Sequence, residues 1–81
     1  RNAQRLATGL AGLGLEVTPW PETNIVRFRA RDALHLWGAL AERGVLVNPV
    51  DAGTLRAVTH LDVGEADIDE ALQRIGAALA A

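Results

Sequence analysis

The sequence contains no cysteine, lysine, serine or methionine in its 81 residues. Without cysteine the chain has no disulfide framework, no thiolate nucleophile and no cysteine-ligated metal. Without lysine no side chain can form a Schiff base with a carbonyl compound, and without serine a Ser-His-Asp hydrolase is excluded. Because the chain also lacks a methionine with which to start, we expect it to be a piece of a longer protein.

Charge and hydropathy narrow the range of partners. The formal net charge is -2 at pH 7, and every basic residue other than histidine is an arginine. A surface for nucleic acid or for an anionic membrane would carry net positive charge, so we expect neither partner. No stretch approaches the roughly 20 apolar residues of a membrane span, and no signal peptide is recognisable. We therefore expect a cytoplasmic protein.

Length and hydropathy predict one small globular domain over residues 1–81. The hydrophobic fraction is 49%, which is too high for a disordered chain. A domain of this length buries only roughly 60–65% of the surface that its unfolded chain exposes. Such a domain is only marginally stable by itself, so we expect a neighbouring domain to support it.

Two periodicities divide the sequence into helices and strands. Apolar residues at three- and four-residue steps predict helices, whereas alternation or a short apolar run predicts strands. The predicted helices cover residues 1–13, 33–43 after an Asp32 cap, and 64 onward, and the predicted strands cover residues 15–18, 24–30, 45–47 and 54–60. The expected buried stripes are Leu34, Trp37, Leu40 and Ala41 in the second helix and Ile68, Leu72, Ile75 and Leu79 in the third. The order α-β-β-α-β-β-α predicts an α+β two-layer sandwich, with a small, mostly antiparallel sheet and helices on one face.

Neither histidine is predicted to be catalytic. His35 lies off the apolar stripe of its helix, and His60, at the end of the last predicted strand, has no second ligand or base beside it. The acidic residues near the start of the last helix are Glu65, Asp67, Asp69 and Glu70. Their spacing does not match a calcium loop, and a helix start favours acids electrostatically. We predict no metal site and no catalytic residue in this chain.

The arginines are better candidates for binding. Arg27, Arg29 and Arg31 alternate around Phe28 and are expected on one side of a strand. A platform for single-stranded nucleic acid would need more aromatic residues than this chain has. We therefore expect these arginines to form a solvated strand face or a face that docks onto another domain.

Arg56 lies in the middle of a predicted strand with little other charge around it. Its guanidinium stays protonated at physiological pH, so it needs an anion, and its planar fork matches a carboxylate. From this chemistry alone, a bound carboxylate ligand and an ion pair with an acid of the same chain are equally good interpretations.

The segment around Arg56 resembles a known family. The string Arg56-Ala57-Val58-Thr59-His60-Leu61-Asp62-Val63 is similar to the R-x-V-T-H-x-D-V string at the C-terminal end of low-specificity L-threonine aldolases. Residues 2–7, 22–26 and 43–48 resemble the family's N-A-x-x-L-A helix, T-N-I strand and R-G-V-L turn in the same order. The resemblance covers nearly the whole chain, and it covers only the small domain of the family.

The resemblance implies the fold-type I pyridoxal-phosphate enzymes of the aspartate aminotransferase superfamily. A large domain carries the cofactor on a lysine, and a C-terminal small domain closes over the site. Residues 1–81 would be that small domain, inactive alone, in a carbon-carbon lyase that cleaves L-threonine or L-allo-threonine to glycine and an aldehyde. The family's arginine that holds the substrate carboxylate corresponds to Arg56, and no cofactor-binding residue is carried over. The implied partners are the large domain, the amino-acid substrate and further copies in a homo-oligomer.

Two other functions remain open from the sequence. One is the small domain of another fold-type I pyridoxal-phosphate lyase or transaminase. The other is a free-standing α+β module in which Arg56 binds a small carboxylate or an internal acid. Residues 48–53 do not align with the threonine aldolase pattern, so the resemblance implies no particular substrate side chain.

Overall fold

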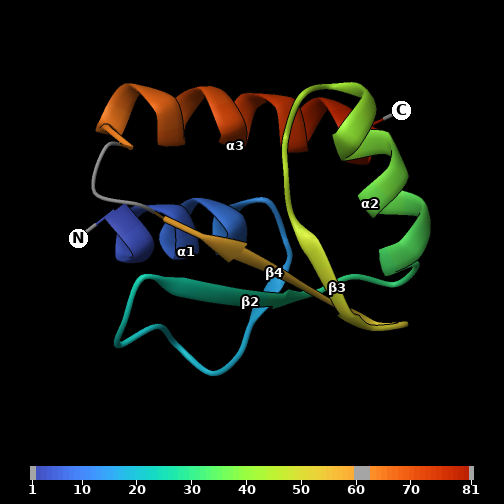
Figure 1. The fold of residues 1–81 in the computed structure, drawn as a ribbon, viewed down its shortest axis with the longest axis horizontal. Coiled ribbons are helices and arrows are strands. Elements are labelled where there is room, and N and C mark those ends of the chain that lie inside the picture. Colours follow the sequence, from blue (N-terminus) through green and yellow to red (C-terminus); the bar gives the residue numbers. More distant parts are fainter. Residues whose placement is uncertain (1, 60–62, 81) are drawn as a thin grey trace.

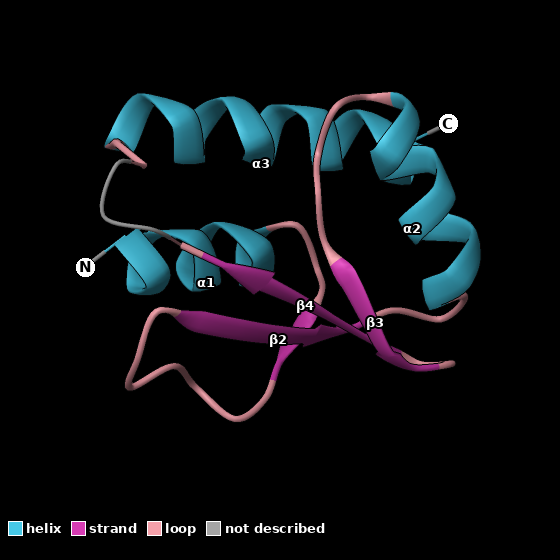
Figure 2. Ribbon diagram, viewed as in Figure 1, coloured by secondary structure: helices cyan, strands magenta, loops and turns pink. Residues whose placement is uncertain are grey.

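Within residues 2–59 and 63–80, which the computed structural model describes, three helices lie on one side of a four-stranded antiparallel sheet (Figures 1 and 2). The elements are α1 (Asn2–Gly12), β1 (Glu16–Val17), β2 (Ile25–Arg29), α2 (Ala33–Glu42), β3 (Asn48–Asp51), β4 (Thr54–Val58) and α3 (Glu65–Ala80). α1 and α3 lie side by side, and α2 packs beside α3 at the other end (Figure 1). The predicted α+β class and the predicted order of elements are both confirmed.

The sheet has the strand order β1-β2-β4-β3, and every pairing in it is antiparallel. Phe28 on β2 stands opposite Leu55 on β4, and both side chains are fully buried beneath the helices. Because side chains alternate along a strand, the neighbouring pair, Arg27 and Arg56, points to the opposite face of the sheet. The sheet therefore has an apolar face under the helices and a polar face, called here the arginine face, away from them.

The helices supply the other half of the core. α1 buries a stripe at three- and four-residue spacing, and α3 adds the buried side chains of Ile68 and Ile75. The α1 stripe consists of Ala3, Leu6, Ala7 and Leu10. Of the α3 stripe expected from the sequence, Leu72 is half-buried and Leu79 is 40% exposed. None of the described helices has the length and apolar character that crossing a bilayer requires.

α2 begins where the sequence predicts but buries a different side. The Asp32 carboxylate accepts a hydrogen bond of 3.2 Å from the backbone N–H of His35, as a helix N-cap should. The buried residues are Ala33, Leu36 and Leu40, whereas Leu34 is 51% exposed and Trp37 is 41% exposed. The predicted stripe is therefore right at Leu40 and wrong at Leu34, Trp37 and Ala41. Apolar residues lie on almost every side of this helix, so spacing alone could not select the buried side.

The third strand lies later in the chain than predicted. Residues 45–47 form a loop, and β3 starts at Asn48. Gly44 has a φ of +78°, its N–H donates to the Ala41 carbonyl, and the N–H of Val45 donates to the Leu40 carbonyl at 2.8 Å. This Schellman arrangement satisfies the last carbonyls of α2. It uses the Val45 N–H for the helix end, and pairing with the sheet begins only beyond it.

Candidate functional site

Arg56 lies in the middle of β4 and is half-buried on the arginine face of the sheet. Arg27 on β2 stands opposite it on one side, and Asn48 on β3 stands opposite it on the other. Across residues 2–59 and 63–80 the ion pairs are Arg5 with Asp69 and Arg74 with Glu70. No carboxylate in that part of the chain is paired with Arg56.

Hydrogen bonds between Asn24 and Thr59 tie β2 and β4 together near Arg56. The Thr59 N–H and hydroxyl donate to the Asn24 carbonyl at 2.8 and 3.1 Å, and the Asn24 amide donates to the Thr59 carbonyl at 3.0 Å. These bonds join the start of β2 to the end of β4, just beyond Arg56 in the strand. Two segments that resemble the aldolase pattern, residues 22–26 and 56–63, are thus in contact through Asn24 and Thr59.

Acidic residues lie near Arg29 on the arginine face. Arg29 faces Glu16 across the β1–β2 pair and also lies close enough to Asp51 to help lower the pKa of that carboxyl. The larger causes of the lowered Asp51 pKa are the hydrogen bonds from the Gly53 N–H, 2.9 Å away, and from the Thr54 side chain. Arg29 therefore has two acids nearby, Glu16 and Asp51, although it forms no ion pair among the described residues.

Arg27 and Arg56 form a like-charged cross-strand pair. Sequence reasoning placed Arg27 with Arg29 and Arg31 rather than with Arg56. Arg27 and Arg29 are exposed on one face as predicted, but Arg31 lies beyond β2, in the turn before α2. Alternation within one strand predicts its faces, but it gives no information on which distant strand will pair with it.

The histidines and the acids at the start of α3 are the other titratable residues that the sequence analysis considered. His35 is exposed on α2, and His60 lies outside the described residues. The Asp67 carboxylate accepts a 3.0 Å hydrogen bond from the Gly64 N–H at the start of α3. Within the described part of the chain, no group of three or more histidine, cysteine or acidic residues is close enough to hold a metal.

The acids further along α3 are paired with arginines. Arg5 on α1 donates two hydrogen bonds, of 3.0 and 2.9 Å, to the carboxylate of Asp69. These hydrogen bonds, more than the accompanying charge attraction, lower the pKa of Asp69. Arg74 pairs with Glu70 one turn away. Asp69 therefore links α3 to α1, and the Glu70–Arg74 pair lies within α3; the sequence predicted acids at the helix start but not these arginine partners.

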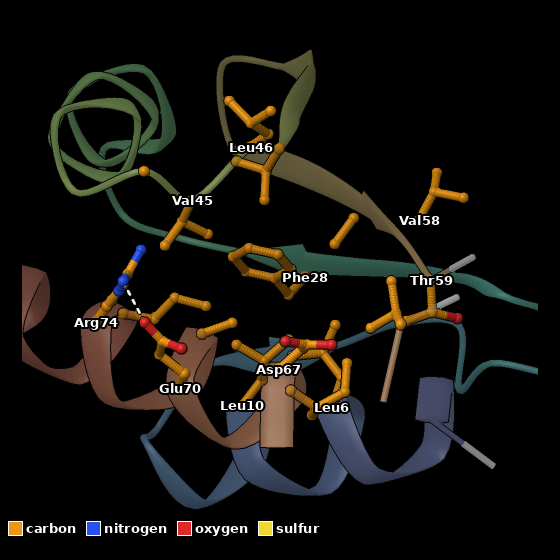
Figure 3. A pocket seen from close by; sticks show the side chains of 17 residues that line it. Leu6, Leu10, Phe28, Val45, Leu46, Val58, Thr59, Asp67, Glu70 and Arg74 are labelled. Atoms are coloured by element: carbon orange, nitrogen blue, oxygen red, sulfur yellow. Dashed lines mark hydrogen bonds and ion pairs between the residues drawn. The ribbon is translucent and has the colours of Figure 1, made fainter. Parts of the chain in front are cut away.

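A cavity of about 270 Å³ lies on the helix side of the sheet (Figure 3). Its walls are mainly apolar side chains of α1, α3, β2, β4 and the loop before β3, including Leu6, Leu10, Phe28, Val45 and Ile75. Among its polar lining residues, Thr59 and Asp67 are already hydrogen-bonded, and Arg74 pairs with Glu70. Arg56 does not line this cavity. We therefore place the candidate site on the arginine face instead.

The donor set limits what this chain can bind. Guanidinium groups can hold a carboxylate or a phosphate, but no side chain here can form a covalent imine with the aldehyde of pyridoxal phosphate, because the chain has no lysine. The arginine face therefore fits the acid end of an amino acid. The lysine that would bind pyridoxal phosphate covalently is absent from this chain.

Comparisons with protein-family models and with curated proteins find no match. Among solved structures, the chain is similar to serine palmitoyltransferase with its PLP internal aldimine, at 28% identity and a TM-score of 0.83. It is also similar to a lysine-to-alanine variant from S. paucimobilis with bound PLP-myriocin aldimine, at 27% identity and a TM-score of 0.80. The enzyme from Sphingomonas wittichii matches with a TM-score of 0.82 at 24% identity, which indicates fold alone.

Each of these matches covers 95% of this chain but only 22% of the serine palmitoyltransferase chain. The chain thus has the fold of one part of a larger pyridoxal-phosphate enzyme. The likeness supports the small domain of the aspartate aminotransferase superfamily, as the resemblance implied. It does not single out threonine aldolase within that superfamily.

Proposed function

We propose that residues 1–81 form the C-terminal small domain of a pyridoxal-phosphate-dependent aldolase, which cleaves L-threonine or L-allo-threonine to glycine and an aldehyde. In this proposal Arg56 binds the substrate α-carboxylate. The observation that carries it is the half-buried residue Arg56, which lies mid-sheet without an acid partner among the described residues. The aldolase-like string over residues 56–63 supports this reaction over others of the superfamily.

Arg56 would act by binding and orienting the substrate. A two-pronged guanidinium–carboxylate contact is charge-assisted and contributes about 1.5–3 kcal/mol. Holding the carboxylate fixes the direction of the Cα–Cβ bond that breaks. Pyridoxal phosphate, when bound by the large domain, supplies the electron sink for the electron pair which that bond releases.

The proton transfers belong to residues outside this chain. The β-hydroxyl must lose a proton as the aldehyde forms, and Cα must gain one to give glycine. His35 lies on α2, on the helix side of the sheet, whereas Arg56 points to the opposite face. The described residues place no titratable base beside Arg56, so the small domain would bind substrate without catalysing the reaction alone.

The arginine face also suggests where the rest of the enzyme lies. Among the described elements, the helices cover only the apolar side of the sheet (Figure 2). A substrate held by Arg56 must be enclosed from the arginine face, so the large domain would cover it. A cytoplasmic homo-oligomer completes the proposal.

A second candidate is another fold-type I enzyme, favoured by the likeness to serine palmitoyltransferase at up to 28% identity. The role of Arg56 would be the same, since amino-acid substrates of either enzyme type have a carboxylate. The two candidates differ in which bond of the amino acid is broken.

The test uses the full-length protein loaded with pyridoxal phosphate. With L-threonine we expect equal amounts of glycine and acetaldehyde, the latter measured through NADH consumption by alcohol dehydrogenase. Arg56→Ala should abolish most of this activity. Consumption of an acyl donor or a keto acid without acetaldehyde release would favour the second candidate and reject the aldolase.

A further inference from the structure

The arginine face brings together two guanidinium groups whose pairing is electrostatically unfavourable. Arg27 and Arg56 are direct partners in the β2–β4 register. Directly opposed residues of an antiparallel pair have their Cβ atoms about 5 Å apart, and like charges at such positions destabilise a sheet. A sheet that contains this pair gains stability when an anion binds between or beside the two groups.

Arg29, on the same face, has more acids around it than Arg27. Arg29, two residues along β2, has Glu16 across the strand pair and Asp51 nearby. Across residues 2–59 and 63–80, Arg27 has no acid as its cross-strand partner and forms no ion pair. Glu22 lines the same surface hollow as Arg27, together with Trp20, but forms no ion pair with it. Asn48, on the other side of Arg56, is uncharged.

We propose that Arg27 determines substrate specificity by binding a second carboxylate, located on the substrate side chain. This inference rests on the proposed function, in which Arg56 holds the α-carboxylate. The other cross-strand neighbour of Arg56 is Asn48, whose neutral amide could donate to the same carboxylate, so one carboxylate can be held there without Arg27. One carboxylate on Arg56 leaves the exposed Arg27 in solvent, whereas a dicarboxylate can contact both guanidinium groups.

The substrate class that fits is a β-hydroxy-α-amino acid with an acidic side chain. β-Hydroxyaspartate is the simplest example, because it has a carboxylate where threonine has a methyl group. Its cleavage is the same reaction: the Cα–Cβ bond breaks, the β-hydroxyl loses its proton as the carbonyl forms, and Cα gains a proton. The products are glycine and glyoxylate, with no net oxidation and no further reactant.

The first test compares the two substrates in the full-length, cofactor-loaded protein. We expect kcat/KM for L-β-hydroxyaspartate to exceed that for L-threonine by about tenfold or more, the value of one charge-assisted contact. Arg27→Gln should lower this ratio about tenfold. Arg29→Gln is the matched control, because it removes the same charge from the same face and strand, and it should leave the ratio unchanged. An unaltered ratio in Arg27→Gln, or an equal loss in Arg29→Gln, overturns the proposal.

The second test measures binding without turnover. In calorimetry on the same protein, succinate should bind about tenfold more tightly than butyrate, which has the same chain length and one carboxylate. Arg27→Gln should remove that preference. The wild-type comparison needs no variant, so equal affinity for succinate and butyrate overturns the proposal even if Arg27→Gln misfolds.

The two tests separate this inference from the proposed function. A protein that prefers succinate but cleaves neither amino acid has the paired-arginine site and is not an aldolase. A protein that cleaves threonine but shows no preference for a dicarboxylate is an aldolase in which Arg27 has no role in specificity.

Discussion

The side-chain amide of Asn24 donates a hydrogen bond to the carbonyl of Thr59, and Thr59 donates two hydrogen bonds back to the carbonyl of Asn24. Thr59 is only 7% exposed. Water replaces these bonds only in part, because Thr59 is buried although Asn24 is exposed. The pair therefore stabilises the end of β4 and, through it, the position of Arg56.

Asn24→Ala should lower the free energy of unfolding by about 1–2 kcal/mol, because it leaves the Thr59 carbonyl without its side-chain donor. Urea denaturation followed by circular dichroism measures this change. Gln4→Ala, at an exposed position of α1, is the control and should change the free energy by less than about 0.5 kcal/mol. Equal effects of the two substitutions would mean that the Asn24–Thr59 bonds contribute nothing to stability.

Arg56→Lys should raise KM for the amino-acid substrate about tenfold or more, because an ammonium group cannot reproduce a two-pronged contact with a carboxylate. Steady-state kinetics of the full-length enzyme measure it. Arg31→Lys makes the same chemical change in the exposed turn before α2 and should leave KM as in the wild type. If Arg56→Lys keeps the wild-type KM, Arg56 does not bind the carboxylate.

Gly9 permits the close packing of α1 against α3. A Cβ placed on Gly9 would overlap the side chain of Leu72, whereas a Cβ on Gly12 would meet nothing within 4 Å apart from its chain neighbours and its own helix backbone. Gly9→Ala should therefore destabilise the protein by about 1–3 kcal/mol through overpacking, despite the better helix propensity of alanine. Gly12→Ala is the matched control.

Thermal or urea unfolding should show Gly12→Ala to be neutral or slightly stabilising. Adding Leu72→Ala to Gly9→Ala removes the side chain that is overpacked, so the two substitutions together should cost less than the sum of their separate effects. Strict additivity would contradict contact between these two positions.

Asp69 should have a pKa below its ordinary value because Arg5 hydrogen-bonds to its ionised form. A lowered folded-state pKa means that the pair adds stability above the unfolded-state pKa of about 3.9, and that this stability is lost as pH falls through the folded-state value. A carboxyl NMR titration should show the pKa of Asp69 rising toward normal in Arg5→Gln.

Asp51 provides an internal control in the same titration. Its pKa is lowered mainly by the Gly53 N–H, with no contribution from Arg5. It should therefore titrate identically in the wild type and in Arg5→Gln. If the Asp69 pKa also stays unchanged, the contact between Arg5 and Asp69 is too weak in solution to affect stability.

The sequence predicted the fold where one physical signal dominated. Val26 and Phe28 alternate with Arg27 and Arg29, so β2 could be placed and its faces assigned. Asp32 has a side chain suited to an N-cap, and the start of α2 followed from it. The buried side of α2 and the start of β3 were predicted wrongly because two signals competed in each segment. The apolar residues of α2 surround the helix, and the Val45 N–H is used in the helix cap although the segment reads as a strand.

The candidate site could be predicted only in part. Arg56 was identified from its isolation in the sequence and from the string that surrounds it. Its cross-strand partner could not be identified, because β2 and β4 are far apart in the chain and their register depends on the complete sheet. The contact between Asn24 and Thr59 could not be predicted either, because these residues are also far apart in the chain.

The two outer strands make poor templates for adding a further strand. β1 has only two residues, and β3 contains Pro49, which has no N–H to donate, beside a register shift. Neither border of the sheet therefore favours edge-to-edge aggregation or pairing with an extended peptide. Docking of other polypeptides should proceed through side chains rather than through shared backbone ladders.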